Sequence, residues 1–213
     1  MKKIGVMGGT FNPLHNGHVE IAKAAYEQYM LDEVWFMPNH IPAYKSDTGI
    51  VSAEHRLNMI NLSISGYDYF KVSDFEITRE GKTYSYETFT LLNNKYPDID
   101  FSFIMGADSL FYFEKWVHPE IILDNAAILV ASRDNNGIDE IDERIQLLKK
   151  IYNKGDFAII KCSNTECSSS ALREYICKMN NGISTNNEEL YVKKYLNKSV
   201  YDYIFSNHLY QYI

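Results

Sequence analysis

The sequence of 213 residues contains few cysteines and has no long hydrophobic run. Its three cysteines form no C-x-x-C pair and have no histidine close by, so we expect neither a disulfide framework nor a zinc site. No stretch approaches the roughly 20 apolar residues of a membrane-spanning helix. The short apolar run at the N-terminus is broken by Gly8, Gly9 and Pro13, so it does not read as a signal peptide. These absences predict a soluble cytoplasmic protein without a membrane partner.

Basic residues are also scarce relative to acidic ones. The chain has 21 lysines and arginines against 28 acidic residues, which gives a formal net charge of −7. Binding to DNA or RNA normally needs a basic face that neutralises phosphates, so a nucleic-acid partner is not expected. A small anionic ligand is compatible with this charge, because a few well-placed basic residues can act locally.

Apolar and polar residues alternate in a way that predicts an α/β fold. The composition, 46% hydrophobic and 23% charged, fits one globular domain over residues 1–213. Strands are predicted at 4–7, 34–37, 70–72, 101–105, 126–131 and 157–160. Helices are predicted at 17–30, 52–64, 84–96, 109–123 (with a second helical turn), 139–152, 168–179, 188–196 and 200–205. This alternation favours a Rossmann-like, doubly wound parallel sheet, with residues 166–213 as a small helical C-terminal part.

Residues 8–18 are the most informative segment, since they join a predicted buried strand to a helix. The adjacent glycines allow a phosphate or a sugar to approach the backbone closely. The helix start offers unpaired N–H groups to an anion, and His15 and His18 project to one side of it. No Lys-Ser/Thr pair follows the glycines, and the spacing is not G-x-G-x-x-G, so this is neither a Walker A loop nor a dinucleotide fingerprint. The alternative is an ordinary turn with two histidines.

The same segment carries a family resemblance. It reads G-G-T-F-N-P-L-H-N-G-H and resembles the signature of the H-x-G-H nucleotidylyltransferases, in the extended form of bacterial nicotinate mononucleotide adenylyltransferases. Residues 38–45, 79–85, 106–116 and 168–173 are similar, in the same order, to further blocks of that family. The chain departs from the family pattern at four places: Asn12 replaces Asp, Ser85 and Ser170 replace Thr, and Asp134-Asn135 replaces Pro-Gly.

The resemblance implies that the mononucleotide phosphate attacks the α-phosphorus of ATP in line and releases pyrophosphate, with Mg²⁺ carried by the ATP phosphates. It implies a catalytic set of His15, His18, Lys45 and Arg173. The implied ATP-binding residues are Gly8, Gly9, Thr10, Phe11, His15, His18, Gly106, Asp108, Ser168, Ser169, Ser170 and Arg173. The implied mononucleotide-binding residues are Asn39, Lys45, Ser85, Trp116 and Arg133. No protein ligand for the metal is implied.

Several alternatives stay open at this point. Trp116 is compatible with a core position, Asp108 with a helix cap, and Lys45 and Arg133 with solvated surface charges. The acceptor can be nicotinamide mononucleotide or phosphopantetheine in place of nicotinate mononucleotide. A non-catalytic nucleotide-binding module is the alternative from another class. The aromatic residues near the C-terminus suit packing or a contact in a homo-oligomer.

Overall fold

The computed structural model describes residues 1–42, 49–132, 137–162 and 166–212. Six parallel strands form its large sheet, in the order β4-β2-β1-β6-β7-β8. These strands are β1 (Lys2–Gly9), β2 (Glu33–Pro38), β4 (Phe70–Val72), β6 (Ile99–Gly106), β7 (Ala127–Ser132) and β8 (Phe157–Lys161). Counted along the chain, the order is 3-2-1-4-5-6, and the winding reverses between β1 and β6. The predicted Rossmann-like fold class is confirmed.

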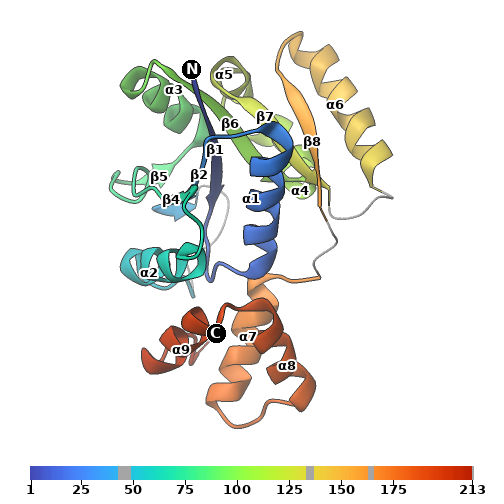
Figure 1. Ribbon diagram of the computed structural model, residues 1–213. Helices are drawn as coiled ribbons and strands as arrows, with labels where there is room; N and C mark the ends of the chain where they lie inside the picture. Colours follow the sequence, from blue (N-terminus) through green and yellow to red (C-terminus); the bar gives the residue numbers. More distant parts are fainter. Residues whose placement is uncertain (43–48, 133–136, 163–165, 213) are drawn as a thin grey trace.

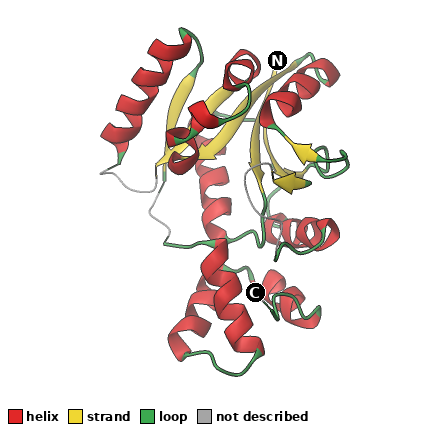
Figure 2. Ribbon diagram, turned by 180° about the vertical axis from the view of Figure 1, so that it is seen from behind, coloured by secondary structure: helices red, strands yellow, loops and turns green. Residues whose placement is uncertain are grey.

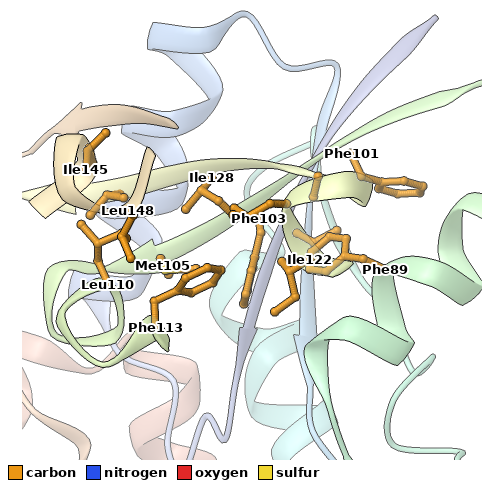
Figure 3. Close-up of a cluster of buried hydrophobic side chains, with 14 of the residues drawn as sticks. Phe89, Phe101, Phe103, Met105, Leu110, Phe113, Ile122, Ile128, Ile145 and Leu148 are labelled. Atoms are coloured by element: carbon orange, nitrogen blue, oxygen red, sulfur yellow. The ribbon is translucent and has the colours of Figure 1, made fainter. Parts of the chain in front are cut away.

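Helices cover both faces of this sheet (Figure 1). One face carries α1 (Asn16–Tyr29) and α2 (Ala53–Ile64). The other face carries α3 (Ser85–Lys95), α4 (Ala107–Phe111), the 3₁₀ turn η1 (Phe113–Lys115), α5 (Pro119–Asn125) and α6 (Ile138–Tyr152). Neighbouring residues of one strand point to opposite faces. Accordingly, Phe103 and Met105 of β6 pack with the second set of helices (Figure 3), while Ile104 packs with the first.

Close packing between strands and helices also explains one glycine of β1. A Cβ atom on Gly5 would lie 2.7 Å from Leu31 Cδ1 and 2.8 Å from Ile104 Cδ1. Real Cβ atoms do not approach other heavy atoms so closely, so a larger residue here would force the ends of the Leu31 and Ile104 side chains to shift. This glycine serves packing, whereas Gly8 and Gly9 lie at the end of the strand.

The last three helices lie at one end of the sheet (Figure 2). They are α7 (Ser169–Asn180), α8 (Asn186–Tyr195) and α9 (Lys198–Ser206). The described residues from 166 to 212 include no strand. The buried side chains of these helices form a separate cluster that also includes Met59 of α2, so α2 packs both on the sheet and on these helices. The single-domain organisation over 1–213, with 166–213 as a distinct part, stays a prediction.

Most predicted elements match the structure within a few residues, and three details differ. A two-stranded sheet of β3 (Ile41–Pro42) and β5 (Lys82–Thr83) was not predicted, because two-residue strands have no periodic pattern. The segment 109–123 is divided among α4, η1 and α5. The spacing of apolar residues predicts that Leu57, with Ile60 and Ile64, lies on the buried face of α2, but Leu57 is only half-buried, and the buried face includes Arg56 instead. Among the described residues, no helix has the length and apolar character needed to cross a membrane.

Candidate active site

A cleft of about 900 Å³ lies at the carboxyl ends of β1 and β6, where the winding of the sheet reverses. This volume falls in the range of small-molecule sites, and the position is the one where doubly wound sheets bind ligands. All the predicted site residues within the described parts of the chain line this cleft. They are Gly8, Gly9, Thr10, Phe11, His15, His18, Asn39, Ser85, Gly106, Asp108, Trp116, Ser168, Ser169, Ser170 and Arg173. The other two, Lys45 and Arg133, lie outside the described residues.

The loop between β1 and α1 is held by its apolar side chains. Phe11 has a left-handed backbone (φ 49°), and its ring is buried between His18 and Phe36, with ring centroids 5.3 Å and 6.0 Å away. Leu14 is fully buried in the same cluster. The Asn12–Pro13 peptide bond is cis. The buried side chains of Phe11 and Leu14 set the place where α1 begins, and therefore the position of both histidines.

The two histidines lie together at the start of α1. His15 precedes the helix, and its backbone N–H donates to Nδ1 of His18 at 3.3 Å. The two rings are 3.8 Å apart at an angle of 36°. Because Nδ1 of His18 accepts a hydrogen bond, the neutral ring carries its proton on Nε2. The prediction that both imidazoles lie on one side of the helix start is confirmed.

The N-terminal part of α7 contacts the loop between β1 and α1 through direct hydrogen bonds. Arg173 Nη1 donates to the carbonyl oxygen of Asn12 at 2.8 Å, and Ser169 Oγ donates to that of Pro13 at 2.9 Å. The Ser168 side chain caps the helix by accepting from Ala171 N at 3.1 Å. A helix N-terminus and a guanidinium group thus lie beside the two imidazoles, and this combination suits an anion with several charges.

The opposite end of the cleft is built around the first residues of α3. Ser85 opens this helix, whose first N–H groups have no partner within the helix. Trp116 is half-buried and packs on Phe103 and Phe113, with ring centroids 5.9 Å and 5.7 Å away, so it belongs both to the core edge and to the cleft wall. Asp108 is not a helix cap, because Gly106 occupies that position of α4.

Sequence reasoning missed a buried polar network behind α3. Thr88 Oγ1 donates to Glu76 Oε1 at 2.6 Å and accepts from Arg79 Nη1 at 3.0 Å. Burial raises the pKa of Glu76 above its ordinary value, although hydrogen bonds from Thr88 and Thr83 and the charge of Arg79 act in the other direction. Glu76 and Thr88 line the cleft. Their only signal in the sequence is an acid beside apolar Phe75 and Ile77.

The described residues offer no ready-made metal cage. Among them, no group of three or more His, Cys, Asp or Glu side chains is placed to hold a metal ion. The polar side chains that line the cleft include imidazoles, a guanidinium and hydroxyls, and also the carboxylates of Glu20, Glu76 and Asp108. The imidazoles, the guanidinium and the hydroxyls are hydrogen-bond donors that suit phosphate oxygens.

Known proteins with similar sequences and structures identify the family. Residues 6–175 match the family described as cytidylyltransferase-like. A probable nicotinate-nucleotide adenylyltransferase of Lachnoclostridium phytofermentans is 46% identical over 176 residues, which cover 83% of this chain and 88% of that relative. A second, from Bacillus mycoides, is 46% identical over 123 residues, or 58% of this chain and 65% of the relative.

A solved structure extends the likeness to the fold. The structure of Plasmodium falciparum nicotinic acid mononucleotide adenylyltransferase complexed with NaAD has a TM-score of 0.80 and 21% identity, covering 100% of this chain and 99% of that chain. The match to the family covers residues 6–175, which include Arg173 and the whole loop between β1 and α1 (the histidine loop). The chain therefore belongs to the cytidylyltransferase-like family and, within it, to the nicotinate-nucleotide adenylyltransferases.

Proposed function

We propose that this protein transfers the adenylyl group of MgATP to nicotinate mononucleotide, producing nicotinate adenine dinucleotide and pyrophosphate in NAD biosynthesis. The observation that carries the proposal is the meeting of His15, His18 and Arg173 at one end of the cleft. Three cationic or hydrogen-bond-donating side chains and a helix N-terminus converge there, which suits a triphosphate.

The reaction joins two anions, so positioning and electrostatics supply most of the catalysis. The mononucleotide phosphate attacks the α-phosphorus of ATP, and the bond to the pyrophosphate oxygen breaks. His18, whose Nε2 carries the proton in the neutral ring, donates to the α-phosphate, and His15 supports the phosphates beside it. Arg173 and the three serines at the start of α7 hold the β- and γ-phosphates, so charge on the leaving pyrophosphate is stabilised.

The acceptor occupies the end of the cleft near α3. Its pyridine ring stacks with Trp116, and its carboxylate accepts from backbone N–H groups near Ser85 and Trp116. Gly106 and Asp108 contact the sugar of ATP, and Asn39 orients the acceptor. Lys45 is proposed to neutralise the phosphates as they approach, and Arg133 to orient the phosphate of the acceptor. Mg²⁺ would enter with ATP, held mainly by phosphate oxygens and water, which suits its preference for oxygen ligands.

Nicotinamide mononucleotide and phosphopantetheine are the alternative acceptors. The test offers each acceptor separately to purified protein with ATP and Mg²⁺, and measures pyrophosphate release over many turnovers. Fast turnover with nicotinate mononucleotide is expected. Preference for another acceptor would change the proposed substrate, and release limited to one turnover or less would favour a non-catalytic binding module. A cytoplasmic location and a homo-oligomeric state stay predictions. Cell fractionation tests the first, and analytical ultracentrifugation tests the second.

A further inference from the structure

Arg56 is a charged residue on the buried face of α2. Its side chain is only 2% exposed, and among the described residues it forms no ion pair with a carboxylate. Burial lowers the pKa of Arg56, but an arginine keeps its charge near neutral pH. An unpaired buried cation is costly for folding, so its presence calls for a reason other than stability.

The guanidinium group donates hydrogen bonds to the backbone of two loops at the active-site cleft. Nη1 donates to the carbonyl oxygens of Thr10 at 3.1 Å and Asn39 at 2.7 Å. Nη2 donates to the carbonyl oxygen of His40 at 3.3 Å. Thr10 follows β1, in the loop that carries the histidines, and Asn39 and His40 follow β2. The planar guanidinium group of Arg56 therefore connects the loop after β1 to the loop after β2, its neighbour in the sheet.

We propose that Arg56 is a positioning residue for adenylyl transfer, which fixes the distance between the ATP-binding loop after β1 and the acceptor-binding loop after β2. This inference rests on the proposed function. Thr10 and Asn39 both line the cleft, whereas Arg56 is not among its lining residues and so is not placed to contact a substrate bound there. Each loop can bind its own substrate alone, but the two phosphates meet in line only when the spacing between the loops is held.

The shape of the side chain matters in this role as well as its charge. A planar guanidinium fork reaches carbonyls on two sides at once, while the ammonium group of lysine is a single point with a shorter reach. Arg56→Lys keeps the positive charge but cannot bridge both loops. Arg56→Lys therefore distinguishes two explanations: activity that needs only a positive charge at this position, and activity that needs the hydrogen-bonded bridge between the loops.

The experiment compares Arg56→Lys and Arg56→Met with Asn58→Ala. Asn58 lies on the same helix, but its Nδ2 donates to Tyr203 Oη of α9 at 2.9 Å and does not face the cleft. For each folded variant, kcat is measured with an active-site titration, and the Kd of ATP and of nicotinate mononucleotide is measured separately. Both Arg56 variants should lose about 10²-fold in kcat, as for a small misplacement of the reacting groups. Each substrate Kd should stay within about threefold, and Asn58→Ala should keep its kcat.

Three results would overturn the inference. The first is a kcat for both Arg56 variants within about twofold of that of Asn58→Ala. The second is full activity of Arg56→Lys with loss only in Arg56→Met, which would assign the role to charge. The third is failure of both variants to fold while Asn58→Ala folds, which would assign Arg56 to stability alone. Lack of dinucleotide formation by the native protein would instead refute the proposed function.

Discussion

The two ends of the cleft are built from different groups. At the histidine end, side chains from distant parts of the chain are tied to loop carbonyls, as Arg173 is to Asn12 and Ser169 to Pro13. At the α3 end, the cleft is lined by the first residues of α3, by Trp116, and by Glu76 and Thr88, and the proposed contacts to the acceptor are backbone N–H groups and the ring of Trp116. The histidine end should thus depend on the identity of its side chains, and the α3 end on the placement of its backbone.

The largest effect is expected at the histidine end. His18→Ala removes the proposed donor to the α-phosphate, and turnover should fall by about 10² or more, as for loss of a transition-state hydrogen bond. Single-turnover kinetics with saturating substrates measure this loss. Since the His18 ring packs on Phe11 and His15, circular dichroism must confirm that the variant is folded.

His18→Gln is the matched variant for this test, because the glutamine amide can place a donor near the position of Nε2. It should retain more turnover than His18→Ala. Near-native turnover in folded His18→Ala would remove this residue from the chemistry and would make the two ends of the cleft alike.

A smaller effect is expected at the α3 end. Trp116→Leu removes an aromatic face, and stacking contributes up to about 1.5 kcal/mol, so the KM for nicotinate mononucleotide should rise about tenfold or less. The KM for ATP should stay unchanged. Ser85→Ala is the control, since a substrate read by backbone N–H groups should lose little when the hydroxyl is removed. A large loss in Ser85→Ala would show that side chains also dominate this end.

Some parts of this molecule could be predicted because their signals are local. Alternating strands and helices gave the parallel sheet, and glycines and histidines directly after a strand marked the cleft. Arg56 and Glu76 could not be assigned in this way. Their roles depend on which carbonyls and hydroxyls the fold brings to them, and the sequence shows only an arginine between His55 and Leu57 and a glutamate between Phe75 and Ile77.

The departure from the family pattern at Asn12 has a structural explanation that no local signal contains. Its Nδ2 donates to the carbonyl oxygen of Gly49 at 2.9 Å, while its Oδ1 accepts from Val51 N at 3.2 Å and from Tyr210 Oη at 2.9 Å. The amide thus uses both its donor and its acceptor, whereas an ionised aspartate could not donate to Gly49. Only the folded chain brings these three partners together.

The bond from Tyr210 ties the C-terminal end of the chain to the histidine loop, and its loss should have a modest effect. Tyr210 is buried, with 6% of its surface exposed. Tyr210→Phe should lower the free energy of unfolding by about 1 kcal/mol, a typical contribution of one hydrogen bond. Asn12 Oδ1 keeps the bond from Val51, so kcat should stay within about twofold. Urea unfolding measures the change, with exposed Tyr212→Phe as the control. If Tyr210→Phe unfolds with the same free energy as Tyr212→Phe, the hydrogen bond from Tyr210 to Asn12 does not contribute to stability.

The smallest effect, and the sharpest test of the α3 end, concerns Glu76. Burial raises its pKa in the folded protein, so the folded state binds this proton more tightly than the unfolded state does. The contribution of Glu76 to stability is therefore fully present below the unfolded pKa and is lost as the pH rises through the folded pKa. Glutamine does not titrate, so the stability of Glu76→Gln relative to the native protein should increase with pH across that window.

Urea unfolding at a series of pH values measures this difference, and Glu80→Gln, at an exposed position, should show no such increase. The glutamine carbonyl oxygen can still accept from Thr88, so the helix start should keep its place and the KM for nicotinate mononucleotide should stay near the native value. A rise in KM without a pH-dependent change in stability would mean that the Glu76 carboxylate itself faces the substrate. In that case the α3 end would also depend on a side chain, and the contrast between the two ends of the cleft would not hold.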